Sequence, residues 1–261
     1  MPLAASANRT LKMDRGALVT FSGQLREARE NALRDSDAFD GIIHMVERLG
    51  SFLGKKIGDL GKYREDLEDR ASHSALAKDV PNQWPSVHIP FSLLYDLVKD
   101  ARNDALHQGA FARHLTGHAI ELSLVLEDAL RRSLDSPAVG DYMVRNPTCA
   151  ELWQPISFIR QQMLANSFSF LPVKYATKWY LVSDLEIATY LGTDVSERRK
   201  SLAHTLTEAK LPLTEAQSCL VDTPLEEALR LLANDQRALL VFRTEQEMQR
   251  LVGIVTPFDL L

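Results

Sequence analysis

Two segments in the C-terminal half of the chain resemble each other, and this duplication constrains the fold more than any other feature of the sequence. Residues 164–173 (LANSFSFLPV) align with residues 232–241 (LANDQRALLV), and residues 180–186 (YLVSDLE) align with residues 253–259 (GIVTPFD). Each copy has the pattern of a helix, two strands and the start of a further helix, and extra residues around 245–249 fit a hairpin turn. Because a duplicated unit buries its open face against its twin, we expect the copies to form one domain.

Three shorter motifs accompany the duplication. The final residues 253–261 (GIVTPFDLL) match a pattern of Gly, two apolar residues, Thr, any two residues and Asp, and residues 222–228 (DTPLEEA) and 142–148 (YMVRNPT) read as entries to the two repeats. On these residues the C-terminal half resembles a tandem pair of CBS domains, the modules named after cystathionine β-synthase. The resemblance implies repeats at about 137–192 and 210–261. It also implies a cleft that holds an adenine nucleotide (AMP, ADP or ATP) or a related adenosyl ligand as regulator.

The resemblance assigns roles to individual residues of these motifs. In the CBS family the Thr contacts phosphate and the Asp holds the ribose hydroxyls, and these roles fall on Thr256 and Asp259. A carboxylate accepts from two vicinal hydroxyls, and a hydroxyl beside a helix N-terminus suits a phosphate. The first repeat departs from the pattern with Tyr180, Ser183 and Glu186, so we expect its site to be closed or altered and one functional site per chain. The nucleotide-binding candidates are Thr256, Asp259, Ser183, Glu186 and Thr148.

The N-terminal half has a different texture, and residues 15–135 are predicted to form a small helical bundle. Residues 18–34 are rich in helix-favouring residues, apolar residues repeat at helical spacing from Phe39 to Leu53, and residues 91–132 contain two further apolar helices. Asp79 to Pro85 is predicted to be a loop, since proline interrupts helices. The pattern of apolar residues changes at Ser136 and Pro137, which predicts domains at 1–136 and 137–261.

Glycines are unusually frequent after the second predicted helix begins. Glycine inside a helix costs about 1 kcal/mol relative to alanine, so its presence needs a reason. Two reasons remain open here: the glycines allow close packing against a partner helix, or they mark a bend. They are Gly50, Gly54, Gly58 and Gly61.

The segment between the last two predicted helices of this half carries an Arg and a His separated by four residues, Arg102 and His107, with Asn103 after the Arg. Positions five apart lie about 140° away from alignment on a helix, so the two side chains do not stack directly. A break at Gly109 would bring them into one cleft.

Arg, a polar residue, a few more residues and then His, between two apolar helices, resembles the active-site motif of the HEPN family. Arg102, Asn103 and His107 match that motif position by position. The resemblance implies that two motifs meet across a homodimer and cleave RNA without a metal. The RNA 2′-hydroxyl would attack the adjacent phosphorus and leave a 2′,3′-cyclic phosphate and a 5′-hydroxyl. His107 would act as general base or acid, Arg102 would stabilise the phosphorane and Asn103 would orient the pair.

Two alternatives to this assignment remain open. A second Arg and His at the same spacing, Arg113 and His118, provides a competing motif. The other alternative is structural: Arg102 pairs with Asp100 or Asp104 on a solvated helix face, and His107 caps a helix end.

Composition limits the function classes. The net charge of −5 argues against a protein that coats nucleic acid through bulk charge, although it leaves room for a local basic cleft. No apolar run approaches the roughly 20 residues of a membrane helix, and the N-terminus lacks the apolar segment of a secretory signal, so we expect a cytoplasmic protein with no membrane partner. The two cysteines make no disulfide framework, and the histidines show no metal-ligand spacing with them.

The sequence therefore predicts an α+β protein, an N-terminal all-α HEPN helical bundle followed by a C-terminal α/β tandem CBS pair. The predicted function is a metal-independent endoribonuclease, a homodimer with RNA as substrate, regulated by an adenine nucleotide and used in stress, antiviral defence or as a toxin. The alternative is a catalytically inactive dimeric nucleotide sensor that regulates a protein partner.

Overall fold

The computed structural model describes residues 13–261 except 36–37, 109–111, 193–197, 234–236 and 247, and leaves out the side chains of residues 103–115. The chain divides into two compact units, Met1–Ser136 and Pro137–Leu261. The mixed α+β class predicted from the sequence is confirmed.

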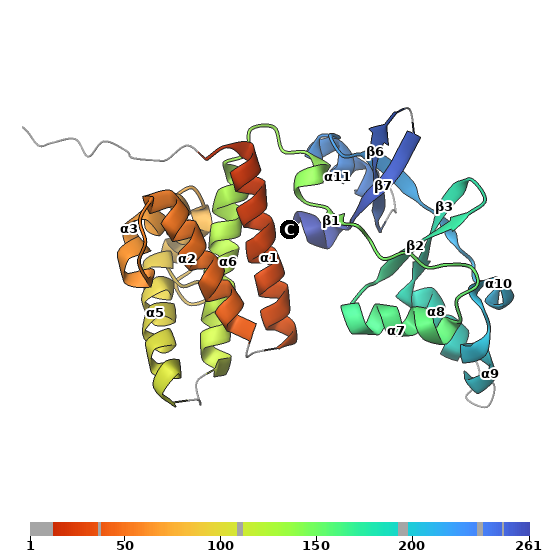
Figure 1. The fold of residues 1–261 in the computed structure, drawn as a ribbon, viewed down its shortest axis with the longest axis horizontal. Coiled ribbons are helices and arrows are strands. Elements are labelled where there is room, and N and C mark those ends of the chain that lie inside the picture. Colours follow the sequence, from red (N-terminus) through yellow and green to blue (C-terminus); the bar gives the residue numbers. More distant parts are fainter. Residues whose placement is uncertain (1–12, 36–37, 109–111, 193–197, 234–236, 247) are drawn as a thin grey trace, which may run out of the picture. The chain divides into compact units, whose positions relative to one another are not determined.

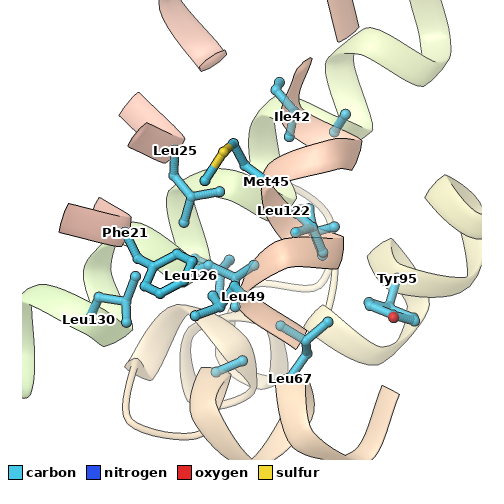
Figure 2. Close-up of a cluster of buried hydrophobic side chains, with 14 of the residues drawn as sticks. Phe21, Leu25, Ile42, Met45, Leu49, Leu67, Tyr95, Leu122, Leu126 and Leu130 are labelled. Carbon is cyan, nitrogen blue, oxygen red and sulfur yellow. The ribbon is translucent and has the colours of Figure 1, made fainter. Parts of the chain in front are cut away.

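The first unit is helical in its described residues (Figure 1). Helix α1 packs on α2 and α6, α2 packs on α3 and α6, and α5 packs on α6. Leu25, Ile42, Leu49, Leu122 and Leu126 are fully buried in one cluster at the centre of this packing (Figure 2). The elements are α1 (Arg15–Arg34), α2 (Phe39–Gly54), α3 (Leu60–Ala71), η2 (Ala75–Ala77), α4 (Asp79–Gln83), α5 (Phe91–Gln108) and α6 (Ala112–Arg132).

One sequence prediction in this unit is wrong, because Asp79–Gln83 is a short helix and not a loop. Pro81 is its third residue. The amide groups of the first turn have no partner inside a helix, so a proline there removes no hydrogen bond. The next amides make the expected bonds, from Asn82 N to Lys78 O at 2.9 Å and from Trp84 N to Val80 O at 2.8 Å.

The structure decides the role of Gly50, which lies in α2 against α3. A Cβ atom at Gly50 would lie 2.5 Å from Cβ and 2.6 Å from Cγ of Tyr63. Tyr63 is buried, and its hydroxyl donates to Lys56 O at 3.2 Å. Packing and this hydrogen bond both restrict movement of the ring. Close packing against a partner helix is therefore the reason for this glycine.

Gly50→Ala should lower the free energy of unfolding by about 1–3 kcal/mol, because it overpacks a contact that cannot relax. Gly23→Ala is the matched control, since Gly23 is exposed in α1 with nothing within 4 Å of a Cβ. It should stabilise the chain by about 0.5–1 kcal/mol. Urea denaturation followed by far-UV circular dichroism measures both, and equal signs for the two variants would contradict the packing argument.

The second unit contains two sheets, with strand orders β1-β7-β6-β5 and β2-β3-β4. Its elements, most of them visible in Figure 1, are η3 (Val139–Asp141), β1 (Val144–Arg145), α7 (Ile156–Asn166), β2 (Phe170–Tyr175), β3 (Lys178–Ser183), α8 (Asp184–Gly192), α9 (Arg198–Ala203), α10 (Leu206–Ala209), β4 (Thr214–Glu215), β5 (Gln217–Leu220), α11 (Leu225–Ala233), β6 (Leu239–Glu245), β7 (Met248–Val255) and η4 (Pro257–Leu260).

The two sheets exchange strands. Strand β1 precedes the first repeat's helix α7 but pairs antiparallel with β7 of the second repeat, with Val144 opposite Ile254. Strand β4 lies after the end of the first repeat but pairs with β3 of that repeat, with Tyr180 opposite Glu215. The duplicated positions Val173 and Val241 also have equivalent neighbours, because each forms a parallel bridge to an upstream segment. The repeats therefore build one interlocked unit.

Candidate functional site

A cavity of about 570 Å³ lies between the two repeats of the second unit. Its volume is within the range of small-molecule sites, roughly 300–1,000 Å³. Both repeats contribute to its wall. The lining residues are Ser169, Phe170 and Asp184 from the first repeat and Leu232, Ala233, Arg237, Thr256, Pro257 and Phe258 from the second.

Some equivalent positions of the two repeats both line this cavity but carry chemically different side chains. Ser169 and Arg237 occupy the same position of the duplicated segments, and so do Asp184 and Pro257. At these two positions the first repeat supplies a hydroxyl and a carboxylate, whereas the second supplies an exposed guanidinium and a proline ring. The two repeats therefore line the cavity with equivalent positions, but the charges at these positions differ.

Thr256 and Asp259, predicted from the terminal motif, are joined at the end of β7. The Asp259 Oδ2 atom accepts from Thr256 N at 2.7 Å and from Thr256 Oγ1 at 2.8 Å, which caps the short helix η4. Asp259 is only 5% exposed. Thr256 lines the cavity, whereas Asp259 is not among the described residues that line it. Asp259 therefore fixes the hydroxyl of Thr256 at the cavity wall.

Ser183 and Glu186 form the same arrangement at the end of β3. Glu186 Oε2 accepts from Ser183 N at 2.8 Å, and Ser183 Oγ accepts from Glu186 N at 3.1 Å. The longer Glu side chain thus replaces Asp as the capping residue. Neither residue is among those that line the cavity, and Thr148 is exposed elsewhere on the unit.

Sequence reasoning missed Arg237, Asp184 and Ser169. A signal for Arg237 was present, because it is the cation of the duplicated segment 232–241 and replaces Ser169 of the first copy. Asp184 follows Ser183 directly and opens α8. Neither residue belongs to the terminal motif, and only the pairing of the repeats brings them to one wall.

Arg102, Asn103 and His107 lie within the continuous helix α5, so the motif is inside a helix and not between two helices. Arg102 is one-third exposed, and its Nη1 atom lies 3.0 Å from Oε1 of Glu47 on α2. This partner differs from the Asp100 or Asp104 considered from the sequence. The side chains of Asn103 and His107 lie outside the described residues, as does that of Arg113, while His118 is half-buried on α6.

The cysteines of the described chain are thiols at neutral pH. Burial raises the pKa of the Cys219 thiol to about 11 and also raises the pKa of Cys149 above its ordinary value. Among the described residues no group of three or more His, Cys, Asp and Glu side chains is arranged to hold a metal ion. Within the same residues, no helix has the length and apolar character needed to span a membrane.

Comparison with known proteins finds one family match, in the second unit, and similar solved structures. Residues 209–261 match the family model of the CBS domain. Three similar solved structures are AcuB from Vibrio cholerae (21% identity, 48% of this chain and 88% of that chain, TM-score 0.39), CBSX2 in complex with AMP (21%, 47% and 91%, TM-score 0.36) and the CBS domain pair of protein MJ0100 in complex with 5′-methylthioadenosine and S-adenosyl-L-methionine (19%, 48% and 94%, TM-score 0.37). No curated protein matches the chain. The family match includes the segment that carries Thr256 and Asp259.

Proposed function

We propose that the second unit binds an adenine-containing ligand in the cavity between its repeats and that this binding regulates the helical unit. The observation that carries the proposal is the cavity itself, which Thr256 of the CBS-type motif and Arg237 both line. The CBS domain pair of MJ0100 binds adenosyl compounds and CBSX2 binds AMP.

The wall chemistry fits the parts of a nucleotide. The guanidinium of Arg237 and the hydroxyl of Thr256 suit a phosphate, because charge-assisted hydrogen bonds to phosphate oxygens are strong. Phe170, Leu232 and Phe258 offer apolar and aromatic surface for the purine. Two carboxylates are candidates for the ribose hydroxyls: Asp259, by the CBS resemblance, and Asp184, which lines the cavity. Because the ligand would touch both repeats, it would favour one arrangement of the pair, and regulation follows if two arrangements bind it with different affinity.

Arg237→Glu should weaken AMP binding at least tenfold, because removing a charge-assisted hydrogen bond loses about 1.5–3 kcal/mol and the new carboxylate repels the phosphate. The assay is isothermal titration calorimetry of the full chain with AMP, ADP, ATP and S-adenosylmethionine. Adenosine, which lacks phosphate, should lose much less affinity.

Arg230→Glu is the matched control for this experiment. Arg230 is an exposed arginine of the same unit, on α11, and does not line the cavity. It should bind AMP like the wild type. Equal AMP affinity in Arg237→Glu and wild type, or no binding of any adenine compound by the wild type, would refute the proposed site.

For the helical unit we propose metal-independent RNA cleavage by a homodimer, with Arg102, Asn103 and His107 in the roles given by the HEPN resemblance. Arg102 is accessible, because its side chain is 32% exposed. A guanidinium in this state can turn toward a phosphate, which it would hold with a bidentate fork. Arg113 and His118 remain the competing pair.

The ion pair between Arg102 and Glu47 favours a second candidate function, a scaffold without catalysis. Glu47 belongs to α2 and its side chain is 22% exposed. A guanidinium already neutralised by a carboxylate of its own chain ties α5 to α2 and offers less charge to RNA. In that case the second unit would act as a nucleotide sensor for a protein partner.

A further inference from the structure

A second cavity, of about 300 Å³, lies on the first repeat between helices α7 and α8. Helix α9 packs against both helices (Figure 1). Its first residue, Arg198, lines the rim of the cavity. Of the described residues that line it, Asp184 alone also lines the cavity between the repeats. The second cavity is therefore a separate hollow on the helical side of this repeat.

The floor of this second cavity is apolar and is part of the core. Met163, Ile187 and Leu191 are 4%, 3% and 5% exposed and belong to the hydrophobic cluster of the first repeat. Leu164 continues the apolar surface outward and is 63% exposed. Apolar surface left in water costs about 25 cal/mol per Å², so a hydrocarbon group that covers the exposed side chain of Leu164 above this floor is favoured.

The rim of the second cavity is cationic. Arg160 of α7 and Arg198 of α9 are both exposed, and within the described residues neither forms an ion pair. The acid on the lining is Asp184, whose Oδ1 atom accepts from Leu185 N at 2.7 Å. Among the described lining residues, two guanidinium groups and one carboxylate that is engaged with the backbone give a net positive charge beside an apolar floor. The complementary ligand has an anionic head and a short apolar body.

We propose that this second cavity binds a small anionic amphiphile, a carboxylate or phosphate monoester that carries a short hydrocarbon chain. The hydrocarbon chain lies on the floor formed by Met163, Ile187 and Leu191 and covers Leu164. The anionic head lies between Arg160 and Arg198. The site does not depend on nucleotide binding between the repeats.

The test is calorimetric titration of the full chain with sodium octanoate and, in a second arm, with octyl phosphate, which separates a carboxylate from a phosphate source. Wild type should bind one molecule per chain. Arg160→Gln and Arg198→Gln should each weaken binding by about two- to fivefold, the range of a partly exposed charge pair. Arg199→Gln removes the same charge from the next residue of α9, which does not line the cavity, and should leave binding unchanged.

A filling variant gives an independent readout. Ala188 is exposed on α8 at the wall, so Ala188→Phe should fold normally and abolish octanoate binding. The proposal is overturned if wild type shows no saturable binding, if Arg198→Gln and Arg199→Gln bind alike, or if AMP displaces octanoate competitively. It is also overturned if wild type binds neither probe while Ala188→Phe dissociates an oligomer seen by light scattering, because the face is then a protein interface.

Discussion

Glu127→Ala should lower the free energy of unfolding by about 3–5 kcal/mol, the range for breaking a buried ion pair by removing one partner. Glu127 on α6 pairs with Arg29 on α1 in a two-pronged contact, from Nε to Oε1 at 2.9 Å and from Nη2 to Oε2 at 3.3 Å. The side chain of Arg29 is 11% exposed and that of Glu127 is 4% exposed. The loss of stability is large because the variant leaves the nearly buried guanidinium of Arg29 without its counter-charge. Urea denaturation followed by far-UV circular dichroism measures it.

Two further variants separate this explanation from a general effect of removing a carboxylate. Glu30→Ala breaks the Arg26–Glu30 pair, in which Glu30 is 42% exposed, and should change stability by no more than about 0.5 kcal/mol. The double variant Arg29→Met with Glu127→Leu removes both charges and should recover most of the loss. If the double variant is as unstable as Glu127→Ala, packing and not charge burial accounts for the effect.

The fold class was predictable because the two halves carry different local patterns. Helical spacing of apolar residues from Phe39 to Leu53 indicates α2 without any knowledge of its partners, and the duplication indicates strands around Val173 and Val241. The prediction failed at Pro81 because the effect of a proline depends on where the helix begins. The helix starts at Asp79, so Pro81 lies in its first turn, where a proline is tolerated.

The candidate sites were predictable only where chemistry follows from a local motif. Thr256, which the terminal pattern predicts as a nucleotide-binding residue, lines the cavity, and its binding role stays a prediction. Arg237 and Asp184 belong to different repeats and line one cavity only in the folded unit, which neither segment alone indicates. Likewise, Glu47 is distant from Arg102 in sequence and becomes its partner only when α2 and α5 fold into one bundle.

RNA cleavage by the full chain should continue in EDTA and fall by at least about 100-fold in His107→Ala, the lower bound for loss of a general acid–base group. Arg102→Ala should lose about 100- to 1,000-fold, as expected when a donor to the developing negative charge is removed. The assay follows a labelled RNA with and without AMP, ADP, ATP and S-adenosylmethionine, and product ends should be 2′,3′-cyclic phosphates. His44→Ala, an exposed histidine of α2, is the control and should cleave like the wild type.

Glu47→Gln decides between catalysis and scaffold, because it removes the counter-charge of Arg102 while keeping the side-chain shape. In a nuclease the freed guanidinium is available to the phosphate, so the cleavage rate should stay equal or rise. If wild type and Glu47→Gln both fail to cut RNA under every ligand while calorimetry still shows nucleotide binding, the helical unit is a scaffold. Glu47→Gln and Arg102→Ala would then lower the stability of the bundle by similar small amounts, within about 1 kcal/mol for a partly exposed pair. In that case the regulated activity belongs to a protein partner.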